Sequence, residues 1–317
     1  MSQMSSLTPS SVGKRAMLLL NKDTFEIADN EEKLLNPIQR KVATIIEPQP
    51  VVEGAGVKLK RSIGTRTLDY LDPFLLLDHF ASHNRADYEA GFPLHPHRGI
   101  ETVTYMLRGG VDHRDSIGNS GSIGPGDIQW MTAGGGIMHE EMPQVRPEGI
   151  DGFQLWVNLP ARLKMTRPRY QGFLANEIPD VEVEGGTRVR VIAGTINGVS
   201  GPVSGIAADP VYLDVSVPAH SSFSHQVSRG HSAFAYVFEG EAAFHDQHIS
   251  HTKLVVLDDG DYVKVVTSES PARFLLVSGK PLNEPIARYG PFVMNTREEI
   301  EQALRDLRQG TFVWSEP

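Results

Sequence analysis

The sequence contains no cysteine among its 317 residues. Disulfides, thiolate nucleophiles and cysteine ligands for zinc or an iron–sulfur cluster are therefore excluded. Any metal must be held by imidazole and carboxylate groups, and the 12 histidines are sufficient for such a site. The absence of cysteine also fits a reducing compartment, so we expect a cytoplasmic protein, or a nuclear one in a eukaryote.

Long apolar runs and an excess of positive charge are also missing. The longest apolar clusters, such as Phe74–Leu77, are strand-sized and far short of the ~20 residues that span a bilayer, so we expect no membrane association. The formal net charge of -9 argues against sequence-independent binding to nucleic acid. We therefore expect no direct nucleic-acid binding, while a protein partner, including a DNA-binding one, stays open.

What the chain does contain is β-structure. From about Val51 onward, Gly, Pro and Asp recur every several residues, and the segments between them are short and rich in β-branched and aromatic residues. This spacing predicts an all-β fold of sandwich or barrel type. The clearest strand-like segments are Glu101–Leu107, Asp127–Met131, Gly152–Val157, Arg188–Ile192, Val211–Val215 and Phe274–Val277. One helix is predicted late in the chain, where a capping box at Thr296–Glu299 precedes helically spaced apolar residues that end at Gly310.

A weak internal repeat organises the β-rich region. Tyr105–Gly109 resembles Tyr236–Gly240, and the turn Pro125–Asp127 resembles Asp259–Asp261 at a similar distance downstream. Two tandem copies of one β-barrel explain both pairs. We therefore expect an N-terminal extension with at most one short helix over residues 1–45, a first barrel over 46–178, and a second over 179–317 that ends in the helix.

The chemistry of the chain is concentrated in the first copy. His95 and His97 are two residues apart, as are His139 and Glu141, and residues i and i+2 of a strand point to the same face. Two such pairs on neighbouring strands would surround one centre with three imidazoles and a carboxylate. This donor set suits Fe, Mn, Ni, Cu or Zn and leaves coordination positions open for substrate or O2.

Glu101 is an alternative carboxylate ligand. It follows His97 at the spacing of a common cupin pattern, so spacing alone does not choose between Glu101 and Glu141. Other features are less informative: Gly134–Gly136 reads as a tight turn, Trp130 and Trp156 as core residues, and Phe92 either as packing or as part of the site entrance.

Several segments of the chain resemble the pirin family from about residue 51 to the C-terminal helix. The matching segments are Arg61–Gly64, Leu71–Leu77, His95–Tyr105, Pro125–Gly134, Gly136–Pro143, Leu155–Leu159 and Gly290–Thr296. The resemblance implies two tandem cupin barrels and one Fe(II) per chain, or another divalent transition metal. It also implies that the ligands are His95, His97, His139 and Glu141, and that Glu101 is not a ligand. As a carboxylate at an open metal site, Glu141 is in addition expected to act as the catalytic base.

Two functions follow from the same resemblance. One is a quercetin 2,3-dioxygenase-like activity, in which a small aromatic or enolic substrate and O2 meet at the metal and the flavonol's central ring is cleaved with release of carbon monoxide. The other is a metal-dependent, redox-sensing binding module that acts as a transcription cofactor. No separate organic cofactor is expected in either case.

The second copy is not expected to bind metal. Gln226 and Ser228 occupy the positions where the first histidine pair would recur. The position equivalent to His139 falls near Arg273 in the sequence. The histidines nearby reproduce neither pair. We therefore predict one metal site, in the N-terminal barrel.

Overall fold

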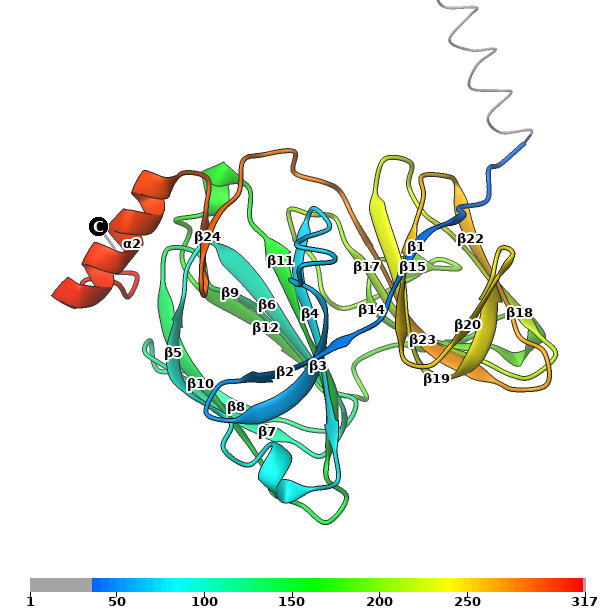
Figure 1. The fold of residues 1–317 in the computed structure, drawn as a ribbon, viewed down its shortest axis with the longest axis horizontal. Coiled ribbons are helices and arrows are strands. Elements are labelled where there is room, and N and C mark those ends of the chain that lie inside the picture. Colours follow the sequence, from blue (N-terminus) through cyan, green and yellow to red (C-terminus); the bar gives the residue numbers. More distant parts are fainter. Residues whose placement is uncertain (1–35, 316–317) are drawn as a thin grey trace, which may run out of the picture.

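The computed structural model describes residues 36–315. In this range two β-barrels lie side by side, and one α-helix packs at the far end of the first barrel (Figure 1). The two-barrel, all-β architecture expected from the sequence is confirmed. No helix within the described range is long and apolar enough to cross a membrane. The short helix considered for the N-terminal extension falls outside the described residues.

The N-terminal barrel consists of two antiparallel sheets. The larger has the order β12-β9-β6-β11-β4-β3-β2, with bounds Arg169–Phe173, Ile128–Thr132, Ile100–Arg108, Ile150–Asn158, Phe74–Ser82, Val57–Ile63 and Gln49–Glu53. The smaller has the order β5-β10-β7-β8, with bounds Phe92–His97, Ile137–Pro143, Val111–Asp115 and Ser120–Ile123. Two 3-10 turns, η1 and η2, cover Arg85–Asp87 and Ala161–Leu163.

The C-terminal barrel repeats this topology. Its main path is β1-β21-β19-β23-β17-β14-β13, with bounds Val42–Ile46, Lys253–Leu257, Ser232–Phe244, Ala272–Gly279, Val211–Val217, Arg188–Ala193 and Asp180–Glu182. The remaining strands pair in the order β18-β22-β19-β20, where β18, β22 and β20 cover Ser222–Gln226, Tyr262–Val266 and Gln247–Ser250. Strand by strand, β18 and β22 correspond to β5 and β10. Short additions are β15 and β16 (Thr195–Ile196, Val199–Ser200) and the 3-10 turn η3 (Glu184–Gly186).

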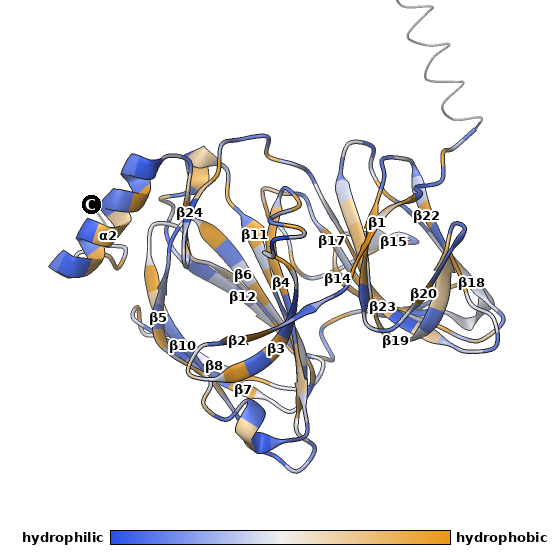
Figure 2. Ribbon diagram, in the orientation of Figure 1, coloured by the Kyte–Doolittle hydropathy of each residue, from blue (hydrophilic) through white to orange (hydrophobic). Residues whose placement is uncertain are grey.

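The largest apolar core lies between the barrels. It contains Val103, Tyr105 and Phe153 from the first large sheet together with Phe234 and Tyr236 from the second. In Figure 2 hydrophobic residues recur along strands of both barrels, because strands covered on two faces need apolar residues on both. One polar group in this interface is paired across it: the Tyr105 hydroxyl of the first barrel donates to Asp214 Oδ2 of the second at 2.7 Å.

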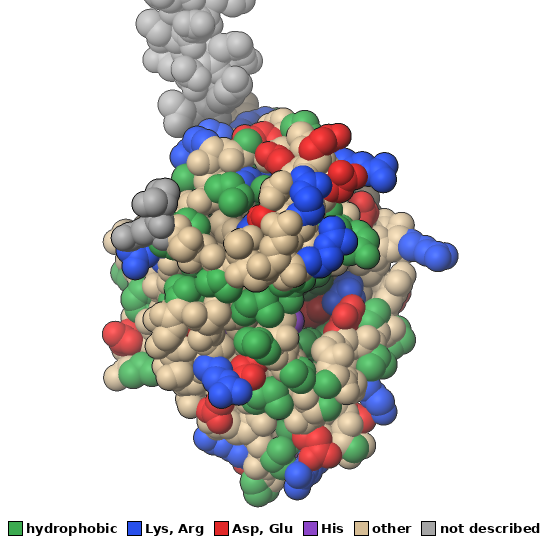
Figure 3. Space-filling model, turned by 90° about the vertical axis from the view of Figure 1, so that its left-hand side faces the viewer, with side chains coloured by type: hydrophobic (Ala, Val, Ile, Leu, Met, Phe, Trp, Pro, Cys, Tyr) green, Lys and Arg blue, Asp and Glu red, His purple; other side chains and the backbone are tan. Residues whose placement is uncertain are grey.

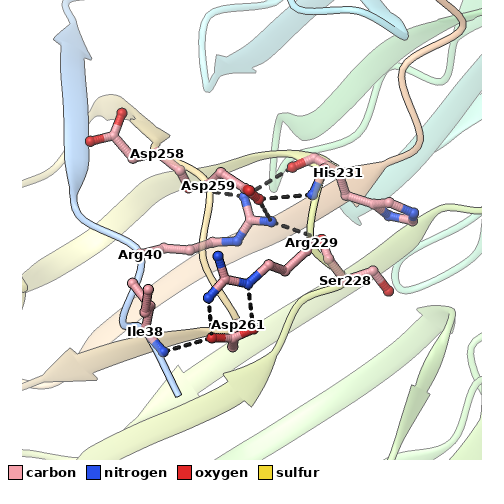
Figure 4. A network of polar contacts seen from close by, with 9 residues as sticks. Ile38, Arg40, Ser228, Arg229, His231, Asp258, Asp259 and Asp261 are labelled. Atoms are coloured by element: carbon pink, nitrogen blue, oxygen red, sulfur yellow. Dashed lines mark hydrogen bonds and ion pairs between the residues drawn. The ribbon is translucent and has the colours of Figure 1, made fainter. Parts of the chain in front are cut away.

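Residues 36–46 belong to the second barrel, which corrects the expectation that the first 45 residues lie outside the main fold. Strand β1 pairs with β21, so the expected boundary at residue 45 falls within a strand. Just before it, the buried guanidinium of Arg40 donates to the carbonyls of Ser228, His231 and Asp258 (Figure 4). Ile38 N–H donates to Asp261. These long-range contacts have no local sequence signal.

The N-terminal residues 36–46 join the second barrel, and the C-terminal segment conversely packs on the first. Strands β24 and β25 (Ala287–Tyr289, Phe292–Met294) and helix α2 (Arg297–Gln309) follow the second barrel in sequence but pack on the first. Thr296 and Glu299 form the predicted capping box, and Gly310 ends α2 with a φ of 74°. Arg98, next to His97, donates to Asp306 of α2 at 2.6 Å and to the Phe312 carbonyl at 3.0 Å. The last element of the chain therefore braces the strand that carries the histidine pair.

Candidate metal centre

Three histidines from β5 and β10 converge inside the N-terminal barrel. His139 lies directly opposite His95 in the antiparallel pairing of these strands, and His97 shares the face of His95. One ring nitrogen from each residue falls within 4.8 Å of those of the other two. The Nε2 atoms of His95 and His97 are 3.0 Å apart. Strand alternation thus brings together the histidines that the sequence singled out.

The surroundings of His97 and His139 favour the neutral imidazole, the form in which histidine binds a metal. Burial, together with the nearby rings of His139 and His95, holds the pKa of His97 well below its usual value. Burial also lowers the pKa of His139 to about 4. The Nδ1 of His95 lies 3.0 Å from the Pro93 carbonyl, and a proton on that nitrogen leaves Nε2 with its lone pair toward the cluster.

Glu141 is close to the cluster but not among its mutually adjacent ligand atoms. It follows His139 by two residues on β10, and its side chain is buried. Its Oε1 accepts a hydrogen bond of 2.9 Å from Thr104 Oγ1, and its Oε2 accepts one of 2.9 Å from Gln154 Nε2. The four-residue group expected from the sequence is therefore present as three gathered histidines and a carboxylate held beside them.

Glu101 points to the other face of β6. Thr104, three residues later, faces Glu141, so strand alternation places Glu101 on the side shared by Val103 and Tyr105, which line the core between the barrels. There Glu101 accepts a hydrogen bond of 2.7 Å from Thr132, and burial raises its pKa. This geometry separates Glu101 from the histidines.

A cavity of about 490 Å³ opens beside His95 and His97. Phe92 and Trp156 are among its lining residues, so Trp156, expected only as a core residue, also contributes to the site, and Phe92 lies at the pocket rather than in the core alone. Trp130, by contrast, is fully buried core, as expected. Figure 3 shows a histidine side chain at the bottom of a hollow bordered by hydrophobic, acidic and basic side chains.

Polar residues of the pocket were not identified from the sequence. Arg61, Asp78, Gln154 and Arg288 come from strands β3, β4, β11 and β24, which are distant in the chain. Only Arg61 fell within a segment that carried the family resemblance, and nothing in its spacing indicated a site. Sheet order brings Arg61, Asp78 and Gln154 together on β3, β4 and β11, and packing of the C-terminal segment on the first barrel adds Arg288.

Comparison with known proteins identifies the family. Residues 56–157 match the family model described as Pirin, and residues 212–313 match the one described as the Pirin C-terminal cupin domain. The chain belongs to the pirin family. A pirin-like protein of Caulobacter vibrioides is 47% identical over 274 residues, which cover 86% of this chain and 99% of that protein. Human pirin is 42% identical over 276 residues, covering 85% and 92% of the two chains.

Among solved structures, a crystal structure titled as quercetin 2,3-dioxygenase from Acinetobacter baumannii superposes with a TM-score of 0.78. It is 36% identical, and the match covers 87% of this chain and 99% of that one. The pirin resemblance noted from the sequence is thereby confirmed at the level of family and fold.

The residues of this pirin fit a metal ion. Both ring nitrogens of His139 are buried without a hydrogen-bond partner in the described part of the chain, although this side chain belongs to the cluster. Buried polar atoms are normally satisfied, so a group that accepts imidazole lone pairs is the natural partner of such a cluster. The cluster can hold one metal ion.

The second barrel offers no equivalent group within residues 36–315, where the three histidines above are the one cluster found. The structure also corrects which residues correspond to His139. Strand β22 is the counterpart of β10, so the position falls within Tyr262–Val266 rather than near Arg273, which lies on β23 and pairs with Asp214. The cross-strand pairs there, such as Ser224 with Lys264, contain no pair of histidines.

Proposed function

We propose that this protein is a mononuclear iron dioxygenase that cleaves quercetin-type flavonols. The observation that carries the proposal is the three-histidine cluster opening onto a cavity of about 490 Å³ with a buried carboxylate beside it. A cavity of this size accommodates a small aromatic ligand. The likeness to a protein titled quercetin 2,3-dioxygenase supports the choice of reaction.

In this proposal His95, His97 and His139 hold Fe(II), and Glu141 is the fourth ligand. Imidazole nitrogens with one carboxylate oxygen are a donor set typical of iron sites that leave positions open. When bound, the iron supplies chelation of the substrate's oxygens and a path for electron density toward O2. Another divalent transition metal would be held by the same residues.

Glu141 is also proposed to accept the proton of the substrate's enolic hydroxyl. Thr104 and Gln154 each donate to one of its oxygens and so fix the plane of the carboxylate. Each carboxylate oxygen has a second lone pair, which leaves room for the substrate proton. The apolar side chains of Phe92 and Trp156 line the cavity and limit water around the reacting ring.

The reaction adds both atoms of O2 to the flavonol, opens its central ring and releases one molecule of carbon monoxide. The test is an anaerobic titration of Fe-loaded protein with quercetin, followed by admission of O2. We expect loss of the flavonol absorbance together with one carbon monoxide for each quercetin consumed.

Tight metal binding with no ring-cleaved product and no carbon monoxide would contradict the dioxygenase proposal. That outcome would favour the second function implied by the family, a metal-dependent binding module whose partner is another protein. Metal-free protein carried through the same steps is the control for uncatalysed oxidation of quercetin.

A further inference from the structure

The mouth of the cavity contains two arginines with different electrostatic surroundings. Arg61 is fully paired: its Nε and Nη2 donate to the two oxygens of Asp78, each at 2.7 Å, and its Nη1 donates to Glu53 at 2.8 Å. Two carboxylates therefore neutralise its charge. Arg61 therefore forms part of the pocket wall, and its donors are occupied by these carboxylates rather than available to a ligand.

Arg288 has no such partner. Its Nη1 donates one hydrogen bond of 3.2 Å to the Leu75 carbonyl, and it forms no ion pair among residues 36–315. The side chain is partly exposed at the cavity mouth, and its partial burial and the nearby positive charge of Arg61 lower its pKa. The carboxylates of Asp69, Asp78 and Glu53 act on it in the opposite direction without forming an ion pair with it.

The position of Arg288 relative to the histidines is set by Trp156. The guanidinium lies over the indole ring, 5.3 Å from its centroid, and the His97 ring meets the same indole edge-on at 5.2 Å. All three side chains line the cavity. A planar ligand lying along Trp156 with one edge at the histidines therefore has its opposite edge near Arg288.

We propose that Arg288 is a specificity-determining residue that binds an anionic oxygen, a carboxylate or an ionised hydroxyl, on the edge of an aromatic ligand away from the histidines. The placement of the ligand's other edge rests on the proposed function. The contribution of Arg288 to binding does not rest on the proposed function, because the ion pair at the cavity mouth forms whether or not the protein converts the ligand into a product.

A matched pair of ligands isolates this contribution. 3,4-Dihydroxybenzoate and 3,4-dihydroxybenzamide share the catechol edge and the ring, and they differ in the charge of the distal group. Binding is measured by calorimetry on protein loaded with Zn(II), which supports chelation without oxidation. We expect wild-type protein to prefer the benzoate, and Arg288→Gln to lose about tenfold in affinity for the benzoate while its affinity for the benzamide stays within about twofold.

Two further variants complete the design. Arg297→Gln removes the same charge from an exposed position on α2 and should leave both affinities unchanged. Arg288→Lys keeps the charge but not the planar guanidinium, so it should retain part of the preference for the benzoate. Raising the salt concentration should weaken only the benzoate, because the ion pair at the mouth is partly exposed to solvent.

Equal losses for both ligands in Arg288→Gln would overturn the proposal and would mean that Arg288 only supports Trp156. Unchanged affinity for the benzoate, or no binding of the benzoate to wild-type protein, would overturn it as well. Failure of the dioxygenase proposal looks different: quercetin would not be cleaved, while the preference for the benzoate would persist in wild-type protein and disappear in Arg288→Gln.

Discussion

Gln154 Nε2 donates a hydrogen bond of 2.9 Å to Glu141 Oε2. The orientation of this amide is set from the other side, because the indole N–H of Trp156 donates to Gln154 Oε1 at 3.1 Å. A flipped amide would place two donors against each other and an oxygen against the carboxylate. The chain of contacts therefore connects the wall of the cavity to the carboxylate beside the histidines.

This chain predicts that Gln154 positions Glu141. Gln154→Leu removes the donor and leaves one carboxylate oxygen without its partner, so we expect kcat for quercetin to fall about tenfold or more, while metal content stays near one per chain. Steady-state kinetics and metal analysis on the same preparation test this. Gln154→Glu, which places a like charge against Glu141, should be more damaging. An unchanged kcat in Gln154→Leu would contradict the positioning role.

His97→Ala tests the metal centre itself. Loss of one of three clustered imidazoles should reduce bound metal from about one per chain to near zero, measured by elemental analysis after purification without added metal. His225→Ala is the matched control, because His225 is a buried histidine on β18 of the second barrel. Full metal content in His97→Ala would place the metal elsewhere.

Substitution of the two buried glutamates, Glu141 and Glu101, should affect metal affinity to very different extents. Glu141→Gln should weaken metal affinity by about 10- to 100-fold, since it removes the charge beside the cluster. Glu101→Gln should leave metal affinity within about twofold, because Glu101 faces the core between the barrels and a neutral amide still accepts from Thr132. Metal titration against a competing chelator measures both. The reverse order of effects would show that Glu101 is the ligand.

Lys164 should stabilise the junction between the first barrel and the C-terminal segment. Its buried Nζ lies 2.9 and 2.8 Å from the carbonyl oxygens of Gly99 and Val293 and 2.6 Å from Asn158 Oδ1, within hydrogen-bonding distance of all three. Lys164→Met leaves these acceptors unsatisfied, and we expect a loss of roughly 2–4 kcal/mol in the free energy of unfolding. Urea denaturation of metal-free protein is the measurement. A loss below the experimental error would contradict the assigned role.

The same side chain predicts a pH dependence. Burial lowers the pKa of Lys164 from 10.5 to about 7. Between these values the unfolded chain binds a proton that the folded protein has released, so the contribution of this group to stability falls as the pH drops from about 10 toward 7. The free energy of unfolding of wild-type protein should therefore rise with pH in this window relative to that of Lys164→Met. Parallel pH profiles of the two proteins would contradict it.

The sequence alone was sufficient for the kind of fold and for the histidines. Short β-rich segments, the repeated turns and the capping box at Thr296 are local patterns, and local patterns reflect backbone preferences that act within a few residues. The pairs His95 with His97 and His139 with Glu141 could be predicted for the same reason. Side chains alternate between the two faces of a strand, and this alternation is a property of a single strand.

Only the tertiary structure decided which groups meet. Glu101 and Glu141 have equally good spacing to the histidines in the sequence. In the fold, Glu101 lies on the face of β6 that points toward the second barrel, away from the histidine cluster. Arg40 and Arg98 anchor segments from opposite ends of the chain across the two barrels, and Arg288 reaches the cavity from a strand nearly two hundred residues after His97. Such contacts depend on how sheets pack and which edges face each other, and no local sequence preference encodes that arrangement.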